Sequence, residues 1–259
     1  MDHDKILNLG AELGRQLMAS GAEIHRVEES VQRLLTAYGM DPQVFAIPNC
    51  LIVSVNTPEG QPVTRMCRIP AHGTDIELLE RCNALCRQLC QDPLPVDEAR
   101  RMVGELKSLG RSFSPPSLLL GYAAAAAFFS LFFGGNWRDF LSAALCGLAV
   151  GLCQLFGSRF TGSNLFFRTA VLSGVASALA ALLVLVGFGH SLESITIGTL
   201  MLLVPGMALT NAMREFMAGD VLSGLARTVE VILVGTAIAL GAAIPLLLFP
   251  GLQGGTIWN

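Results

Sequence analysis

The chain has 259 residues, of which 52% are hydrophobic and only 14% are charged, whereas about a quarter are charged in an average soluble protein. Its formal net charge is −3, so it lacks the basic excess that nucleic-acid backbones require, and we exclude nucleic acid as a partner. Most charged residues precede Phe113, and nearly continuous apolar sequence follows. We therefore expect two domains, 1–112 outside the membrane and 113–259 within it.

The amino-terminal residues contain no basic opening followed by an apolar core and a small-residue cleavage site, so the sequence shows no signal peptide. We therefore expect domain 1–112 to lie in the cytoplasm. The seven cysteines have no paired spacing typical of a secreted disulfide framework. A reducing compartment would keep them as thiols.

Residues 1–112 combine two patterns, which together indicate a small cytoplasmic α+β domain. Between Gln43 and Ile69 β-branched residues are frequent, and Pro58, Glu59 and Gly60 supply a turn between two strand-like runs. About 110 residues are enough for a modest hydrophobic core. Apolar residues at helical spacing predict helices near 6–18, 24–35, 74–90 and 96–110.

Apolar stretches dominate residues 113–259, and each is near the length needed to cross about 30 Å of hydrocarbon. Ser114 followed by Pro115 and Pro116 is a favourable helix start. Small residues such as Gly147 and Gly151 allow close approach between helices. The predicted spans are 116–133, 140–156, 166–188, 195–209 and 229–248. The sequence thus predicts a polytopic α-helical membrane protein with about five transmembrane helices and an N-terminal cytoplasmic α+β domain.

Basic residues orient these spans, because they concentrate in cytoplasmic connectors. They gather before the first span, between the second and third, and between the fourth and fifth. The residues concerned are Arg100, Arg101, Lys107, Arg111, Arg159, Arg168, Arg214 and Arg227. The opposite connectors contain Arg138 alone. We therefore expect a cytoplasmic N-terminus, a cytoplasmic segment 204–227 and an extracytoplasmic C-terminus in the cell membrane.

Segment 204–227, VPGMALTNAMREFMAGDVLSGLAR, is far more polar than a short connector needs to be. Pro205 and Gly206 are expected to break the fourth span and to free backbone groups, as in the binding sites of transporters. Arg214 and Glu215 follow Asn211 by three and four residues, so an amide, a guanidinium and a carboxylate share one helix face. Such a set suits a substrate carboxylate with an amine or hydroxyl beside it.

Two interpretations of these charges stay open. A cation at membrane depth costs roughly 2.5 to 3.5 kcal/mol, so a partly buried Arg214 needs Glu215, Asp220, Asn211 or an anionic substrate as its partner. Alternatively, Arg214 and Arg227 lie at the water interface and pair locally with Glu215 and Asp220. Glu230, at the start of the fifth span, is either a functional ionisable group or an intrahelical partner of Arg227.

Two clusters in domain 1–112 have a functional and a structural interpretation. The stretch GAEIHRVEES places Glu23, His25, Arg26, Glu28 and Glu29 together. It suggests an acid/base or metal site, but it lacks a defined ligand spacing, and we favour a solvated helix face.

The second cluster consists of Cys82, Cys86 and Cys90 at four-residue steps on one helix face. It is either a thiolate metal site or a packing face, and we favour packing. The sequence has no phosphate-binding glycine loop and no nucleophile motif with a base. We therefore expect no enzyme activity, no cofactor and no metal.

Three stretches resemble the threonine/serine exporter family, and the resemblance covers nearly the whole chain. They are SGAEIHRVEESVQRLLTAYGMD, VFAIPNCLIVSV and LLVPGMALTNAMREFMAGDVLSGLAR. More narrowly, the chain is similar to the amino-terminal subunit of split members, which works with a smaller, separately encoded membrane subunit. The resemblance implies export of threonine and serine or of dicarboxylates such as succinate, all of which carry a carboxylate. Glu215 stands where many relatives have aspartate.

We therefore expect a secondary exporter subunit that acts in the lipid membrane with a second membrane subunit and in an oligomer. Arg214 would hold the substrate carboxylate, and Asp220 or Glu230 would exchange a coupling proton. The alternative is a regulatory or scaffold subunit whose cytoplasmic domain senses a metabolite. The expected substrate-binding residues are Pro205, Gly206, Asn211, Arg214, Glu215, Asp220, Ser223 and Arg227.

Overall fold

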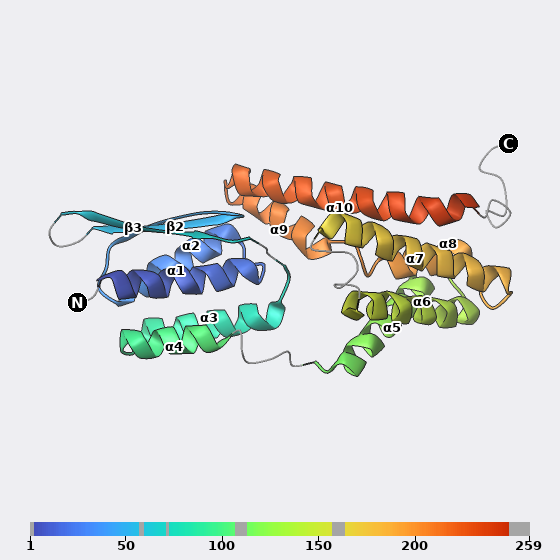
Figure 1. Cartoon of the computed structure of the whole chain (residues 1–259), viewed down its shortest axis with the longest axis horizontal. Helices are drawn as coiled ribbons and strands as arrows, with labels where there is room; N and C mark the ends of the chain where they lie inside the picture. Colours follow the sequence, from blue (N-terminus) through green and yellow to red (C-terminus); the bar gives the residue numbers. More distant parts are fainter. Residues whose placement is uncertain (1–2, 57–59, 71–72, 107–112, 157–163, 249–259) are drawn as a thin grey trace. The chain divides into compact units, whose positions relative to one another are not determined.

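The computed structural model describes residues 3–56, 60–70, 73–106, 113–156 and 164–248 (Figure 1). The chain divides into two compact units. The α+β unit combines Met1–Ser112 with Gly206–Val229, and the helical unit combines Phe113–Pro205 with Glu230–Asn259. Several residues used in the sequence predictions lie outside the described residues, namely Pro58, Glu59, Lys107, Arg111 and Arg159.

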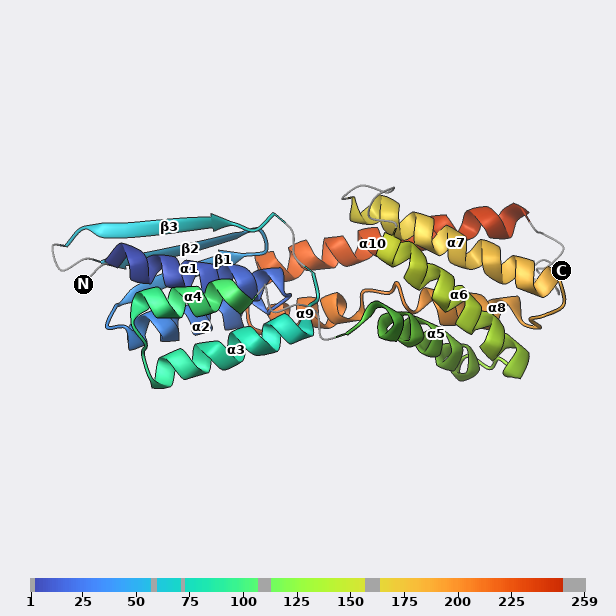
Figure 2. The same cartoon turned by 60° about the horizontal axis from the view of Figure 1, so that its bottom comes forward.

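The α+β unit is layered, with two helices between a sheet and a second pair of helices. Helices α1 and α2 contact both the sheet and the pair α3 and α4 (Figures 1 and 2). The bounds are α1 His3–Ala19, α2 Ile24–Ala37, β1 Pro42–Ile47, β2 Cys50–Asn56, β3 Pro62–Arg68, α3 Ile76–Gln91 and α4 Val96–Leu106. This arrangement buries the apolar stripes of α1 and α2 in one core.

The sheet is antiparallel with the order β1-β2-β3. Alternate residues Leu51, Val53 and Val55 of β2 are buried against the helices. Gly14 of α1 allows the close approach, because a Cβ there would lie 2.4 Å from Leu51 Cδ2. The sequence predicted two strand-like runs, but the first run is two strands. A turn at Pro48 and Asn49 divides it, since proline has no N–H for the ladder.

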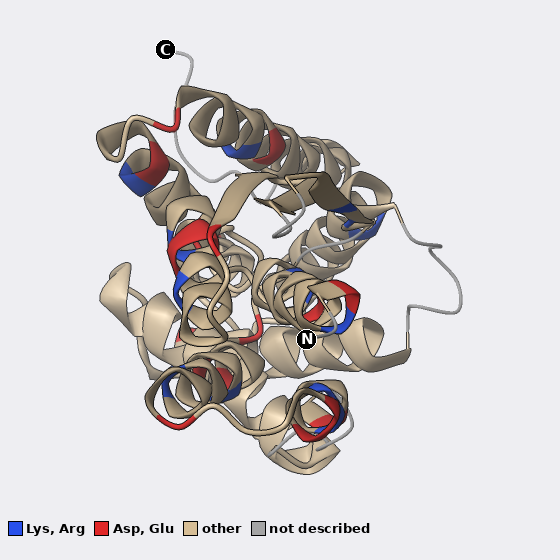
Figure 3. Ribbon diagram, turned by 90° about the vertical axis from the view of Figure 1, so that its left-hand side faces the viewer, with Lys and Arg blue, Asp and Glu red and all other residues tan. Residues whose placement is uncertain are grey.

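The surface of the α+β unit carries acidic and basic residues side by side on the same helices (Figure 3). Examples are the pairs Arg33–Glu29 of α2 and Arg81–Glu77 of α3, each spaced by four residues. Such exposed or half-exposed pairs stabilise a helix by about 0.3 to 0.5 kcal/mol each. They solvate the unit and contribute little to its fold.

The helical unit contains α5 Pro115–Phe132, α6 Trp137–Phe156, α7 Leu165–Leu185, α8 Leu192–Leu200 and most of α10 Val221–Leu248. Among the described residues, α5, α6, α7 and α10 are long and apolar enough to cross a membrane. The predicted span 195–209 is instead divided between α8 and α9 Gly206–Met217, with Met201–Leu203 in turns. Pro205 has no N–H to donate and disfavours a helical Val204, so the helix breaks here. The total of five spans stays a prediction.

Glycines allow the helices of this unit to approach closely. A Cβ on Gly147 of α6 would lie 2.5 Å from Tyr122 O of α5. A Cβ on Gly241 of α10 would lie 2.1 Å from Ala170 O of α7. Ser173 Oγ donates to Ile238 O across the same α7–α10 contact at 2.5 Å. Larger side chains at either glycine would push the helices apart.

Candidate functional site

The polar segment 204–227 forms a helical corner in the α+β unit. Helix α9 ends in a Schellman motif, in which Gly219 N–H donates to Phe216 O at 3.1 Å and Asp220 N–H donates to Glu215 O at 2.9 Å. Gly219 has φ +88°, a conformation that favours glycine. Helix α10 then begins at Val221. The corner brings side chains from both helices to the turn between α1 and α2.

Arg214 of α9 reaches Glu23, which immediately precedes α2. Arg214 Nη1 donates to Glu23 Oε1 at 2.6 Å, and the side-chain exposures are 62% and 10%. Arg26 Nε and His25 Nε2 lie 3.4 and 3.5 Å from the other oxygen, Glu23 Oε2. A nearly buried carboxylate is therefore held among two guanidinium groups and an imidazole.

Glu215 and Arg227 form a second, fully buried pair, with side-chain exposures of 0% and 8%. Arg227 Nε lies 2.9 Å from Glu215 Oε1, but the contact does not have hydrogen-bond geometry. Arg227 Nη2 donates to Ala22 O at 2.8 Å. Glu215 Oε1 accepts from Ile24 N–H at 3.4 Å, which caps the first turn of α2. The pair thus attaches α9 and α10 to the α1–α2 turn.

Several buried polar atoms in this pair have no hydrogen-bond partner among the described residues. In the pair these atoms are Glu215 Oε2 and Arg227 Nε. Beside the pair, Ser223 Oγ, one turn before Arg227, is a third such atom. Burial raises the pKa of Glu215 above its ordinary value of 4.5, although the charge of Arg227 acts in the opposite direction. Buried polar groups normally find partners. This cluster therefore has unused capacity to bind a proton, water or ligand.

A cavity of 210 Å³ lies beside Arg214 and is lined by α1, α2, α3, α9 and the turn between α1 and α2. Asn211 Nδ2 donates to Gly21 O at its edge, at 3.3 Å. The polar side chains that line the cavity are Glu23, Arg26, Ser30, Asn83, Asn211 and Arg214. Two guanidinium groups, one carboxylate and several neutral polar groups suit a small molecule with both charges, or an anion.

The structure separates the predicted site residues into groups. Asn211 and Arg214 line the cavity, whereas Pro205 and Gly206 do not. Helix α9 begins at Gly206, so these two residues mark the helix break. Three other predicted residues of the corner form the adjoining buried cluster, namely Glu215, Ser223 and Arg227.

Asp220 and Glu230, the predicted proton-exchanging residues, lie apart from the cavity lining. Asp220 is half-buried at the corner, and its charge adds to the effect of burial in raising the pKa of Glu28. Glu230 is half-buried on α10 and belongs to the helical unit.

The prediction that Glu23 lies on a solvated helix face is wrong. Glu23 is buried and occupies the N-cap position of α2, with extended backbone angles of φ −67° and ψ 138°. A signal was present: Glu23 directly precedes Ile24, the first residue of the buried stripe of α2. A residue at that place precedes the helix rather than lying on its solvated face, and the Glu23 side chain contacts Arg214 instead of capping α2. Its partner Arg214 is 191 residues away, which local patterns cannot reveal.

The cysteine row on α3 is a packing face. Cys82 and Cys86 are buried, and burial raises the pKa of each thiol to about 12. They are therefore protonated near neutral pH, whereas metals bind thiolates. Within the described residues, no group of three or more His, Cys, Asp or Glu side chains could hold a metal ion.

Comparison with known proteins places these features in a family. Residues 8–249 match the family described as "Putative threonine/serine exporter". The chain is 24% identical to the "Probable threonine/serine exporter" of Mycobacterium tuberculosis, over 93% of this chain and 46% of that protein. It is 29% identical to "Pheromone-regulated membrane protein 10" of Debaryomyces hansenii, over 89% of this chain and 24% of that protein.

The corresponding protein of Saccharomyces cerevisiae is 27% identical over 89% of this chain and 31% of its own length. The chain thus spans less than half of each of these relatives. No solved structure matches the chain. The family match nevertheless extends over nearly all of its residues, including the α+β domain, the apolar helices and the polar corner. The chain therefore belongs to the threonine/serine exporter family, whose members are membrane exporters rather than enzymes.

Proposed function

We propose that this chain is the substrate-receiving part of a membrane exporter for small metabolites that carry a carboxylate. Threonine-like and serine-like amino acids and dicarboxylates such as succinate are the expected classes. The observation that carries the proposal is the exposed guanidinium of Arg214 beside a polar cavity of 210 Å³, in a chain of this family. We also propose a second, smaller membrane subunit and assembly into an oligomer.

The cavity supplies a partner for each polar group of a small amino acid. Arg214 and Arg26 flank Glu23, and an incoming carboxylate would take one guanidinium from it by a charge-assisted contact. The oxygen of Glu23 released in this way would accept the substrate ammonium. Asn211, Ser30 and the other lining amide would bind a hydroxyl. A dicarboxylate would engage both guanidinium groups and leave only His25 beside the carboxylate of Glu23, so the site favours a zwitterion.

The direction of transport and its coupling complete the proposal. We place the polar corner and the N-terminus on the cytoplasmic side, where an exporter first meets its substrate. Asp220 or Glu230 would exchange the coupling proton, because both are half-buried acids near the start of the last predicted span. Asp220→Asn and Glu230→Gln proteins should then retain substrate binding but lose the dependence of export on a pH gradient.

The central experiment measures export of threonine, serine and succinate from cells that make this chain with its candidate partner subunit. Arg214→Ala should lower export by about tenfold or more, because charge-assisted hydrogen bonds contribute roughly 1.5 to 3 kcal/mol. The matched control is Arg101→Ala, which removes an exposed arginine of α4 that contacts Glu105. Unchanged export by a correctly inserted Arg214→Ala protein would exclude the substrate role of Arg214.

A metabolite-sensing subunit is the second candidate function, and one observation favours it. Eight of the eleven residues that line the cavity belong to α1, α2, α3 and the turn between α1 and α2, so most of its wall lies outside segment 204–227. In that case the full chain would bind the metabolite through Arg214, and the transport path would belong to the partner. Export that still occurs at the wild-type rate in Arg214→Ala cells, but no longer responds to added metabolite, would favour sensing over transport.

A further inference from the structure

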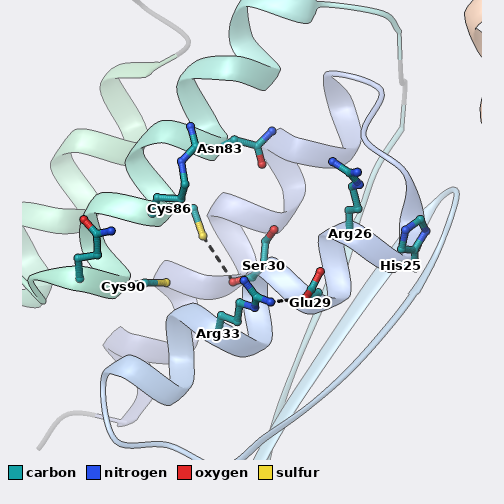
Figure 4. A pocket seen from close by; sticks show the side chains of 10 residues that line it. His25, Arg26, Glu29, Ser30, Arg33, Asn83, Cys86 and Cys90 are labelled. Atoms are coloured by element: carbon teal, nitrogen blue, oxygen red, sulfur yellow. Dashed lines mark hydrogen bonds and ion pairs between the residues drawn. The ribbon is translucent and has the colours of Figure 1, made fainter.

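A second and larger concavity lies between α2 and α3, and we name it the α2/α3 cleft (Figure 4). Its volume is 590 Å³. Helix α2 contributes Arg26, Ser30 and Arg33, whose four- and three-residue spacing places them in one stripe. Helix α3 contributes Asn83 and Arg87, one turn apart. Two facing helix stripes therefore form its walls.

The charge of this cleft is opposite to that of the chain. Three arginines and a single carboxylate, that of Glu29, line it, whereas the whole chain has a net charge of −3. Glu29 Oε1 accepts from Arg33 Nη2 at 2.5 Å, which neutralises one cation. Arg26 Nε lies near Glu23, at 3.4 Å. Arg87 has no ion pair among the described residues, so the cleft retains positive charge.

The other lining groups are neutral and can form hydrogen bonds. Cys86 Sγ donates to Ser30 O at 3.6 Å across the floor of the cleft. Its pKa of about 12 keeps this thiol neutral, so the floor adds no negative charge. His25 lines the rim, and its Nδ1 is buried without a hydrogen-bond partner among the described residues. The side chains of Arg26 and Arg33 are 69% and 71% exposed, so a ligand from solvent can reach cations that surround a neutral, hydrogen-bonding floor.

The geometry points to a binding site for a small organic dianion in the α2/α3 cleft, the shared chemistry of a dicarboxylate and a phosphate monoester. Arg26 and Arg33 are seven residues apart, which corresponds to roughly 10 Å along a helix. Arg87 faces them from α3. Two anionic groups of one ligand can thus contact separate guanidinium groups, each by a bidentate contact.

This site adjoins the proposed export site, but each has residues of its own. Arg33 and Arg87 line the α2/α3 cleft but not the cavity beside Arg214, whereas Asn211 and Arg214 line only that cavity. Arg26, Ser30 and Asn83 line both, so they are unsuitable for a test. A regulatory anion at this place would act through Arg26 on Glu23, the carboxylate that Arg214 also contacts.

The test is calorimetric titration of the purified full chain in lipid nanodiscs at low ionic strength, with succinate, glycerol phosphate and acetate as probes. The chain with Arg33→Gln and Arg87→Gln should bind the dianions about tenfold more weakly or worse, since two charge-assisted contacts are lost. The matched control carries Arg100→Gln and Arg101→Gln on α4, with the same net charge, and should change affinity by less than about twofold. Acetate should bind far more weakly than either dianion.

The two dianions distinguish a dicarboxylate ligand from a phosphate monoester. Whichever of succinate and glycerol phosphate binds with the lower Kd identifies the anionic group that the cleft prefers. Dianion binding should persist in Arg214→Ala, which separates this proposal from the export proposal. Three results would overturn it: no dianion binding by the wild-type chain, equal weakening in both double variants, or acetate binding as tight as succinate binding. Thermal unfolding of each variant checks that it is folded.

Discussion

Two buried carboxylates, one in each unit, differ in how completely they are hydrogen-bonded. In the helical unit, Asp139 Oδ1 accepts from His190 N–H at 2.6 Å and Ser191 N–H at 2.8 Å, and Oδ2 accepts from Asn136 N–H at 3.0 Å. In the α+β unit, Glu215 has one arginine and one backbone contact at 3.4 Å, and its Oε2 finds no hydrogen-bond partner in the part of the chain that the structure describes. The side chain of Asp139 ties two turns together, whereas that of Glu215 has unused capacity.

This difference separates a structural carboxylate from a candidate functional one. Three backbone donors hold the side chain of Asp139 in one orientation and occupy both of its oxygens. A buried ion pair with an unsatisfied oxygen is different, because its desolvation offsets much of its attraction. We therefore expect a change near Glu215 to affect both stability and function. A change at Asp139 should affect stability alone.

The largest expected effect on stability comes from Arg227→Ala. This change leaves the carboxylate of Glu215 buried without its cation, which costs about 3 to 5 kcal/mol in comparable pairs. Denaturant unfolding of the purified protein measures the loss. Adding Glu215→Leu should recover most of it, because no buried charge then remains. An Arg227→Ala protein as stable as the wild type would show that the pair is not buried in solution.

Asp139→Ala should come next, with a loss of about 3 kcal/mol, since three backbone N–H groups lose their acceptor. Asp139→Asn keeps one acceptor oxygen and should lose less. Amide hydrogen exchange at His190 and Ser191 should accelerate in step with the loss. Binding of succinate and threonine should not change, because Asp139 belongs to the helical unit and lines no part of either cavity. A weaker affinity would contradict the structural role.

The dependence of stability on pH gives a smaller effect. Burial raises the pKa of Glu215 and of Glu28 above the ordinary value of 4.5. The folded chain then binds more protons than the unfolded chain above that pH. Their contribution to stability is complete below it and is lost as pH rises through the folded pKa values. Unfolding measured from pH 4 upward should show this decline, and Glu215→Gln should make it shallower. An unchanged slope would exclude Glu215 as a source.

Local patterns predicted the parts of this molecule that local contacts determine. The apolar spacing in α1 to α4 identified the helices, because the buried stripe of each repeats within a few residues. Asn136 and Asp139 cap each other at the start of α6, and their spacing of three residues is typical of such a cap. Asp139 N–H donates to Asn136 Oδ1 at 3.1 Å, and Asn136 N–H donates to Asp139 Oδ2 at 3.0 Å. The contacts of Asp139 with His190 and Ser191 depend on tertiary packing, so no local pattern contained them.

The candidate site was predictable only in part, for the same reason. Segment 204–227 was recognised from its polarity, and Asn211 and Arg214 do line a cavity. The buried position of Glu23 and its pairing with Arg214 depend on contacts across 191 residues. The arginines of the α2/α3 cleft lie on two helices that pack together in space, but all three strands lie between these helices in the sequence. Each helix alone carries the pattern of a solvated face, and only their packing brings the cations together.

The smallest expected effect on stability belongs to Arg214→Ala. The guanidinium is 62% exposed, so its contact with Glu23 is screened by water and contributes no more than about 1 kcal/mol. The same change should nevertheless reduce export far more than Asp139→Ala does, because Arg214 is an exposed cation of the cavity that the substrate can reach. Thermal unfolding and export measured on one set of variants would give opposite orders for Arg214→Ala and Asp139→Ala. Parallel losses of stability and export in the two variants would show that export simply follows folding. Asp139 would then no longer differ, as a structural residue, from the functional residues around Glu215.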